Sequence, residues 1–308
     1  SPTLINVTFR DNTAQGFGGG MRNWYNSSPR LTNVAFQGNS AGNYGGGLGN
    51  NENSNPTLTN VTFLDNTASL GGGLANQGNS STTLVNGIFG GNSADYGGGM
   101  FNEGIYDSSM VKMSNTVFSG NYANNDGGAI ENRGSILELR QVTVANNGAE
   151  GAGGGLNVAA TGVPVERLQI FNSIFWGNMA AHGAQLSNVD PAAPVTLDHS
   201  LVQGGCPADV SCGEFLFADP LFEDAAGADG LFGTDDDDLR LQEASPAINS
   251  GDDAQVPVDE LDLDQDGITD GELLPYDLLG YGRIYGAAVD MGACEWQEFY
   301  LFLPAIMR

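Results

Sequence analysis

Three aspartates at alternate positions of one short stretch carry the clearest chemical signal in the sequence. Asp262, Asp264 and Asp266 are followed by Gly267 and then by Asp270. They occupy positions 1, 3, 5, 6 and 9 of a loop with the oxygen-ligand spacing of an EF-hand-type calcium loop, in which the glycine allows a sharp turn. Alternate carboxylates can then converge on one cation. The spacing predicts calcium binding, and a solvated acidic turn is the alternative.

The twelfth position of this loop departs from the pattern. It is Leu273, where a bidentate glutamate is expected, and Glu272 stands one residue earlier. Glu272 is therefore a candidate ligand only if the loop is shorter than usual. A second acidic stretch, residues 229–238, ends in four adjacent aspartates. These repel one another unless a cation neutralises them. Asp235 and Asp237 are its candidate ligands, although no strict spacing is met.

The cysteines predict one short covalent link. Cys206 and Cys212 flank a five-residue loop. We expect a disulfide between them, because the chain has the features of an extracellular protein, and two free thiols are the alternative. Cys294 is left over and is expected to be a buried thiol.

A repeat of about 27 residues runs through the first two-thirds of the chain and indicates the fold that positions these groups. Each copy starts with an apolar residue and carries an aromatic or apolar residue five positions later. The starting residues are Leu4, Leu31, Leu58, Leu84, Met113, Leu139, Ile170 and Leu197. The apolar runs are short and rich in Val, Ile, Thr and Phe, while glycine is too frequent for helices, so each copy is predicted to form strands.

Asparagine and glycine recur at fixed places in each copy. Asn6, two residues after the starting Leu4, begins one asparagine series, and the chain is predicted to bend there in left-handed backbone. Asn12 and Asn23 begin two further series, and Gly18 begins the glycine runs. Stacked asparagines can hydrogen-bond to one another and to the backbone, and glycine permits close approach of two backbones. The recurring asparagines and the recurring glycines are therefore interpreted as structural residues.

These patterns predict an all-β protein in which residues 1–205 form a parallel β-helix. We expect a solenoid of about eight coils, each with about 27 residues and three short strands. Successive coils should stack at roughly 4.8 Å. The stacking requires Phe9, Phe36 and Phe63 to lie directly over one another.

The repeat resembles that of the polymorphic outer-membrane proteins. Their repeat pairs Phe-x-x-Asn with Gly-Gly-Ala-Ile, and residues 127–130 match the second motif literally. The Gly-Gly-Gly-Leu and Gly-Gly-Gly-Met versions are similar to the repeats of many secreted bacterial β-helix proteins. The resemblance covers residues 1–205 and implies a right-handed β-helix exposed at the cell surface.

Charge excludes some partners and divides the chain. The net charge is −27, with 37 acidic and 10 basic residues, and Lys112 is the only lysine. No basic patch could neutralise nucleic-acid phosphates, and no apolar run is long enough to span a membrane. Residues 205–308 contain 24 of the acids and 3 of the bases. The sequence therefore predicts a separate, irregular acidic region at residues 206–296.

Short motifs within residues 214–296 resemble, as an ordered set, the choice-of-anchor Q region of secreted bacterial β-helix proteins. They lie at residues 217–222, 238–241, 245–252 and 289–295. The resemblance implies an extracellular or cell-surface location. It implies no reaction.

Residues 297–308 form an apolar tail that is too short to cross a bilayer. The tail is expected either to pack on its own body or to be donated as a strand to a neighbouring copy. Donation has a physical reason, because a β-helix that starts within a repeat leaves an unpaired strand edge that another strand can cover. The residues assigned to this assembly role are Phe299, Tyr300, Leu301, Phe302, Leu303 and Ile306.

Paired acids must be considered because parallel β-helices include polysaccharide lyases and hydrolases. Asp11 and Asp65 share a position two coils apart, and Glu103 and Glu131 flank the third asparagine series. We interpret both pairs as surface acids and assign no catalytic residue, so the sequence leans away from an enzyme.

The sequence favours a secreted or cell-surface structural or adhesive β-helix that binds calcium and self-associates, with filaments built by coil stacking and the tail as one form of this assembly. The alternative is a β-helix that binds or degrades polysaccharide. Phe17, Tyr44 and Tyr96 each stand just before a glycine run and so form an aromatic stripe. This stripe is compatible with either reading, because aromatic rings at one position in each coil can pack on one another or stack on sugars.

Overall fold

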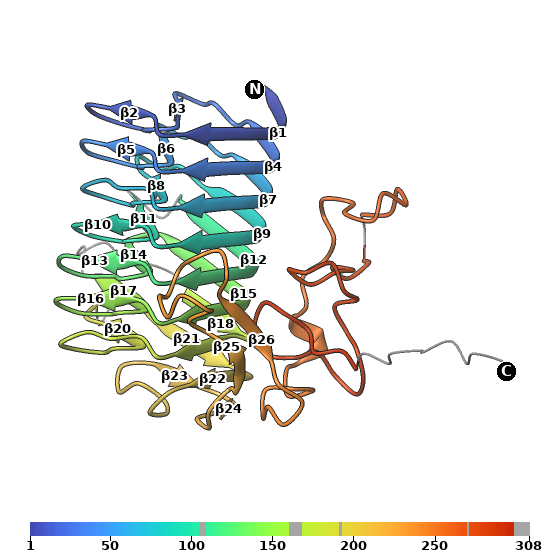
Figure 1. The fold of residues 1–308 in the computed structure, drawn as a ribbon. Helices are drawn as coiled ribbons and strands as arrows, with labels where there is room; N and C mark the ends of the chain where they lie inside the picture. The colour runs from blue at the N-terminus through green and yellow to red at the C-terminus, as the bar shows by residue number, and fades with distance from the viewer. Residues whose placement is uncertain (105–108, 160–167, 191–192, 270, 299–308) are drawn as a thin grey trace, which may run out of the picture.

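The computed structural model describes residues 1–104, 109–159, 168–190, 193–269 and 271–298. The chain winds as a parallel β-solenoid of about seven turns, with the N-terminus at one end of the rod (Figure 1). The first coil consists of β1 (Thr3–Arg10), β2 (Thr13–Ala14) and β3 (Met21–Trp24). The predicted fold class is confirmed.

Later coils repeat these three strands. The long strands corresponding to β1 are β4 (Arg30–Gln37), β7 (Thr57–Leu64), β9 (Thr82–Gly90), β12 (Met110–Ser119) and β15 (Ile136–Ala145), then the split pairs β18 (Leu168–Phe171) with β19 (Ile174–Trp176) and β21 (Val195–Asp198) with β22 (Ser200–Val202). The strands corresponding to β2 are β5 (Ser40–Ala41), β10 (Ser93–Ala94), β13 (Tyr122–Ala123) and β16 (Gly148–Ala149). Those corresponding to β3 are β6 (Leu48–Asn51), β8 (Leu74–Asn76), β11 (Met100–Glu103), β14 (Ile130–Arg133), β17 (Leu156–Ala159) and β20 (Leu186–Asn188).

The coils stack in strict register. Phe9 pairs with Phe36, and Phe36 with Phe63, along parallel neighbouring strands. Their rings stack with centroids 5.0 Å apart at each step. Phe89 and Phe118 continue the column. The condition on which the β-helix prediction depended is therefore met.

Each long strand bends at the asparagine that the spacing identified. Asn6 has φ 57°, and Asn33 and Asn60 in the next coils have φ 54° and 53°. Only a few residue types adopt this left-handed backbone readily, and asparagine is one of them. Gln141 and His199 replace asparagine in later coils and keep the positive φ. The bend turns the residues on its two sides toward one interior. Most coils carry one long bent strand and two short ones, whereas the third and seventh coils have only isolated bridges, at Thr67 and Met179, in place of the two-residue strand.

A second asparagine series fills the interior with hydrogen bonds. The Asn66 side-chain amide donates to Asn92 Oδ1 at 3.0 Å and to the Phe36 carbonyl at 2.9 Å. Asn92 repeats both bonds with Asn121 and the Phe63 carbonyl. This column runs from coil to coil as far as Asn178, so the buried turns keep their backbone groups paired.

Glycine is required where two coils touch. A Cβ on Gly46 would lie 2.4 Å from the Gly72 carbonyl oxygen of the next coil, and one on Gly72 would lie equally close to Gly98. Gly45 also has φ 66°. Any larger residue there would push the coils apart.

The eighth coil is incomplete, which corrects the predicted count. After Val202 the chain turns at Gly204 and Gly205, both with positive φ, and forms no third strand like β20. The solenoid nevertheless continues past the predicted boundary at residue 205. β23 (Ser211–Cys212) pairs with β21, and β24 (Phe215–Leu216) pairs with β22.

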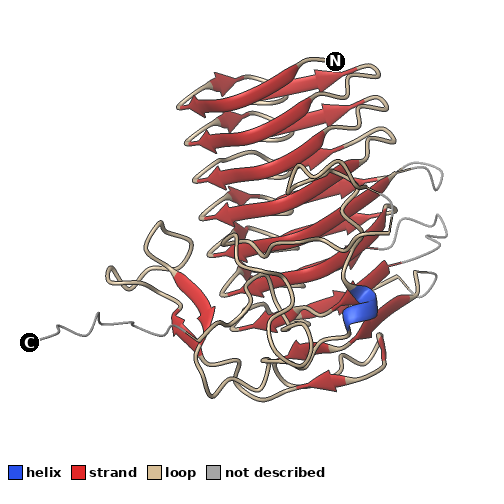
Figure 2. Cartoon of the chain, turned by 90° about the vertical axis from the view of Figure 1, so that its right-hand side faces the viewer, coloured by secondary structure: helices blue, strands red, loops and turns tan. Residues whose placement is uncertain are grey.

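The acidic C-terminal region packs across the outer face of the long-strand sheet over its later coils (Figure 2). It contains the antiparallel pair β25 (Phe222–Asp224) and β26 (Asp238–Leu241) and a short 3-10 helix η1 (Asp253–Gln255). Three apolar clusters join it to the solenoid. They are centred on Val117 with Leu239, on Ile174 with Met291, and on Val85 with Val289. Burial of these side chains makes the region an integral layer of the protein.

Candidate metal centre and the docked C-terminal region

The first acidic loop gathers its carboxylates as the spacing predicted. Asp262, Asp264 and Asp266 each offer an oxygen, and these three atoms lie within 4.8 Å of one another. The turn is closed by backbone amides: Gly267 N–H donates to Asp262 Oδ1 at 3.1 Å, and Ile268 N–H donates to Asp266 Oδ1 at 2.8 Å. Gly267 has φ 85°, the left-handed turn that glycine permits. The arrangement leaves carboxylate oxygens available to a cation.

Glu272 lies close enough to interact with this loop. Burial, followed by the charges of Asp266 and Asp264, raises the pKa of the Glu272 carboxyl. One of its oxygens, Oε2, is shielded from solvent and has no hydrogen-bond partner among the described residues. A cation at the loop would relieve this mutual repulsion. Asp270, the remaining predicted ligand, lies outside the described residues.

The second acidic loop is tied to the solenoid by hydrogen bonds. Asp237 Oδ2 accepts from Gly233 N–H at 2.7 Å and from the Ser119 hydroxyl of the solenoid at 2.8 Å. Within the described residues, the only group of three or more acids close enough to share a cation is that of Asp262, Asp264 and Asp266. Asp237 thus anchors the second loop to β12, and cation binding by Asp235 and Asp237 stays a prediction.

Cys206 and Cys212 are joined in a disulfide in the structure. Cys212 lies on β23, so the bridge closes the turn that follows the last coil. Cys294 is buried with a free thiol between the C-terminal region and the solenoid, and burial raises its pKa to about 12. The thiol is therefore not reactive at neutral pH.

The paired acids that were considered for catalysis occupy turn positions or take part in buried hydrogen bonds. Asp11 and Asp65 both have φ 54° and occupy a turn position. Glu131 is not the surface acid that the sequence suggested: it is fully buried and accepts hydrogen bonds from Arg133 and Asn157. Burial raises the pKa of this Glu131 carboxyl.

The rings of the aromatic stripe pack against one another and against arginine side chains. Phe17 and Tyr44 stack face to face, with centroids 5.1 Å apart and planes within 5°. Arg133 lies over the Tyr96 ring, 4.3 Å from its centroid. Leu70 separates Tyr44 from Tyr96 in the column. Sugar stacking needs a free ring face, so this arrangement favours packing.

A buried ionic cluster that the sequence analysis missed fastens the C-terminal region to the solenoid. Arg283 is 1% exposed and pairs with Glu295 at 3.1 Å. Its guanidinium also donates to Asn115 Oδ1, on the solenoid bend, and to the carbonyls of Asp290 and Gly292. One side chain thus bridges the two layers. No repeat or spacing marks Arg283, so only the folded structure could reveal it.

Two further acids complete this cluster. Asp277 and Asp290 are fully buried, and their oxygens accept hydrogen bonds from the backbone amides of Leu279, Glu295 and Trp296, among others. Burial raises the pKa of the Asp277, Asp290 and Glu295 carboxyls, for Glu295 to about 8, although Arg283 opposes each shift. The cluster brings three acids around one guanidinium.

This cluster predicts a stability that falls with rising pH. The carboxyl of Glu295 has a higher pKa in the folded state than in the unfolded chain. At pH values between the ordinary pKa of a glutamate and about 8, the folded state therefore binds more protons than the unfolded chain. Stability is therefore greatest at the acidic end of this window and is lost as the pH rises through it. We expect the melting temperature to fall by several degrees between pH 5.5 and pH 8.5, measured by calorimetry.

The variant Glu295→Gln provides the control for this prediction, because it cannot titrate. Its melting temperature should change less over the same range. An equal slope in both proteins would contradict the assignment.

The tail residues Phe299, Tyr300, Leu301, Phe302, Leu303 and Ile306 lie outside the described residues. No helix among the residues that the structure describes combines the length and apolar character needed to cross a membrane.

The comparisons give one family match. The model of the Chlamydia polymorphic membrane protein repeat matches residues 115–133. This stretch runs from the bend at Asn115 through Phe118 and Asn121 to the end of β14, which is most of one coil. No curated protein matches the chain. The repeats are thus similar to those of the polymorphic membrane proteins and form a β-helix.

Proposed function

We propose that this protein is a surface or structural β-helix protein whose rod acts as a rigid scaffold. The observation that carries the proposal is that the repeated residues serve the scaffold itself. Phenylalanines stack, asparagines pair from coil to coil, and glycines allow the coils to touch. The match to a membrane-protein repeat supports placement at a surface. The disulfide supports an oxidising, extracellular compartment.

Localisation tests this role directly. An antibody raised against the protein should label intact cells or the extracellular matrix of the source organism, and protease added to those cells should remove the signal. A signal found only after lysis would contradict the proposal.

The finer proposal is adhesion and self-association into filaments. It is supported by the stacking of like coils in register, because the same backbone pairing can template the addition of another chain. Light scattering and electron microscopy of the purified chain should show particles heavier and longer than one copy. Deletion of residues 297–308 should return them to single rods if the tail is donated. Equal particle mass with and without the tail would exclude donation.

Calcium is proposed as the stabilising ion of the first acidic loop. Binding to the folded state alone stabilises a protein by RT ln(1 + [L]/Kd), or about 2.7 kcal/mol at a hundredfold excess over Kd. We expect a chelator to lower the melting temperature and added calcium to restore it. Asp264→Asn should remove this response, because it takes a charge from the ligand set. The exposed Asp209→Asn is the matched control and should respond like the unaltered protein.

A melting temperature that is indifferent to calcium and chelator would remove the ion from the proposal and leave the scaffold role untouched.

A further inference from the structure

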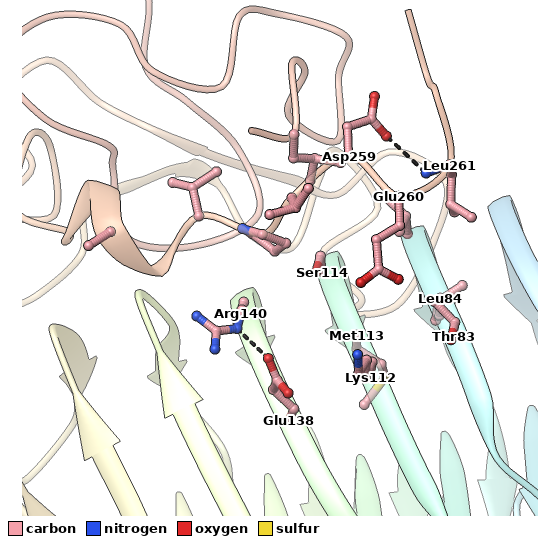
Figure 3. Close-up of a pocket in the computed structure, with 16 residues that line it drawn as sticks. Thr83, Leu84, Lys112, Met113, Ser114, Glu138, Arg140, Asp259, Glu260 and Leu261 are labelled. Carbon is pink, nitrogen blue, oxygen red and sulfur yellow. Dashed lines mark hydrogen bonds and ion pairs between the residues drawn. The ribbon is translucent and has the colours of Figure 1, made fainter. Parts of the chain in front are cut away.

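A cavity of about 280 Å³ lies between the outer face of the long-strand sheet and the segment around residues 254–261 (Figure 3). Its sheet wall includes Thr83 on β9 and Lys112 and Ser114 on β12. Its other wall is formed by the C-terminal region and includes Glu260. The volume is at the lower end of ligand sites in proteins and suits one or two small rings.

Lys112 supplies a positive charge without an internal partner. It pairs in register with Thr83 and with Glu138 on the neighbouring strands. No carboxylate of the described residues lies within ion-pair distance of its ammonium group. Glu138 instead pairs with Arg140, whose guanidinium also donates to Gln255. Lys112 is therefore the cation of this cavity that remains available to a ligand.

Glu260 supplies the opposing acceptor. Its side chain is directed down toward the sheet between Leu84 and Ser114, whereas that of the adjacent Asp259 is turned away (Figure 3). Asp259 is engaged by the backbone amides of Leu261 and Leu263. Glu260 accepts no hydrogen bond from a described residue. An acid and a base that are both unpaired thus face one cavity from opposite walls.

The rest of the lining combines hydroxyls with an apolar surface. The side-chain hydroxyls of Thr83 and Ser114 have no hydrogen-bond partner among the described residues, so both can donate to or accept from a ligand. Val256 and Leu274 contribute buried apolar surface from the C-terminal region. A ligand that fits must present one negative charge, several hydroxyls and an apolar face.

We propose that this cavity binds a sugar acid, a single uronate residue of a saccharide. Its carboxylate would pair with the Lys112 ammonium, and its hydroxyls would donate to Glu260 and exchange hydrogen bonds with Ser114 and Thr83. The ring's C–H face would lie on Val256 and Leu274. A polyanion fits less well, because the chain's net charge of −27 repels it. This site does not depend on the scaffold role and adds a ligand to it.

Titration calorimetry of the full chain tests the proposal with glucuronic and galacturonic acid and their disaccharides, against glucose and galactose. The acids should bind at least tenfold more tightly than the neutral sugars. Lys112→Met should weaken acid binding at least tenfold, and Glu260→Gln severalfold. Arg10→Met and Glu243→Gln change an exposed basic residue and an exposed acidic residue elsewhere and should leave binding unchanged. Equal binding of neutral and acidic sugars, or full binding by Lys112→Met, would overturn the proposal.

The unique lysine allows a second test on the unaltered protein. An amine-reactive acylating reagent can modify only Lys112 and the N-terminal amine. Saturating uronate should slow acylation of Lys112 at least threefold, as measured by peptide mass spectrometry, with the N-terminal amine as internal reference. Unchanged acylation of Lys112 would contradict the proposal even if a variant failed to fold.

Discussion

Replacing Asn92 by alanine should destabilise the solenoid by about 3 to 5 kcal/mol, which is more than we expect for an asparagine of the exposed column. The Asn92 side chain donates to the Phe63 carbonyl and to Asn121 Oδ1, and its own Oδ1 accepts from the backbone amide and side chain of Asn66. Alanine would leave the buried Asn66 backbone amide without its acceptor, at about 1 to 3 kcal/mol, and would also remove the side-chain bonds to the Phe63 carbonyl and to Asn121. A small cavity would add to this cost.

Urea unfolding followed by circular dichroism measures this effect. Asn60→Gly is the matched control, because Asn60 belongs to the exposed asparagine column and glycine keeps its left-handed backbone. We expect the control to cost about 1 kcal/mol or less. If the two variants unfolded at the same urea concentration, the interior column would contribute no more than the exterior one.

Replacing Arg283 by methionine should release the C-terminal region from the solenoid. The change removes the counter-charge of Glu295 and the bond to Asn115, and it leaves three buried carboxyls without their cation. Above pH 8 the Glu295 carboxyl is ionised, and the comparison is made there. Removal of one partner from a buried ion pair then costs about 3 to 5 kcal/mol, because the other charge stays desolvated. Methionine fills a similar volume, so most of the cost should be electrostatic.

Limited proteolysis and tryptophan fluorescence measure the release. Trp176 on the solenoid and Trp296 in the C-terminal region both pack against one apolar cluster at this interface, so their emission should shift to longer wavelength when it opens. Arg240→Met is the control, since Arg240 pairs with Asp238 at the surface and such pairs contribute about 1 kcal/mol or less. Protease resistance equal to that of the unaltered protein would show that the apolar clusters alone hold the region in place.

The solenoid could be predicted because its information is local and repeated. The spacing of Leu4, Asn6 and Val7 identified the bend, and the structure has φ 57° at Asn6. The repeat also predicted the stacking of the interior asparagines, because a residue that recurs once in every coil of a solenoid lies directly above and below its equivalents. The predicted number of coils was less accurate where the repeat pattern becomes irregular, because the eighth coil, which starts at Leu197, lacks its third strand.

The C-terminal region could be predicted only in part. The loop at Asp262, Asp264 and Asp266 was found because its residues are neighbours in the sequence. The bond from Arg283 to Asn115 and the cavity at Lys112 depend on contacts between residues more than a hundred positions apart. No periodicity marks such contacts. The bond from Ser119 to Asp237 was not predicted for the same reason.

The close approach of coils at glycine bears on how such a chain can change its length. The Gly46 backbone meets Gly72 of the next coil, and Gly72 meets Gly98, in the same way. The coils from Gly19 to Gly128 each meet a glycine of the next coil in this way. Loss or duplication of one whole repeat in the gene would join two matching surfaces. Coils of 26, 27, 29 and 31 residues stack in the same asparagine column, so the loops between strands absorb smaller changes in length. Rod length can thus evolve in whole steps of one turn.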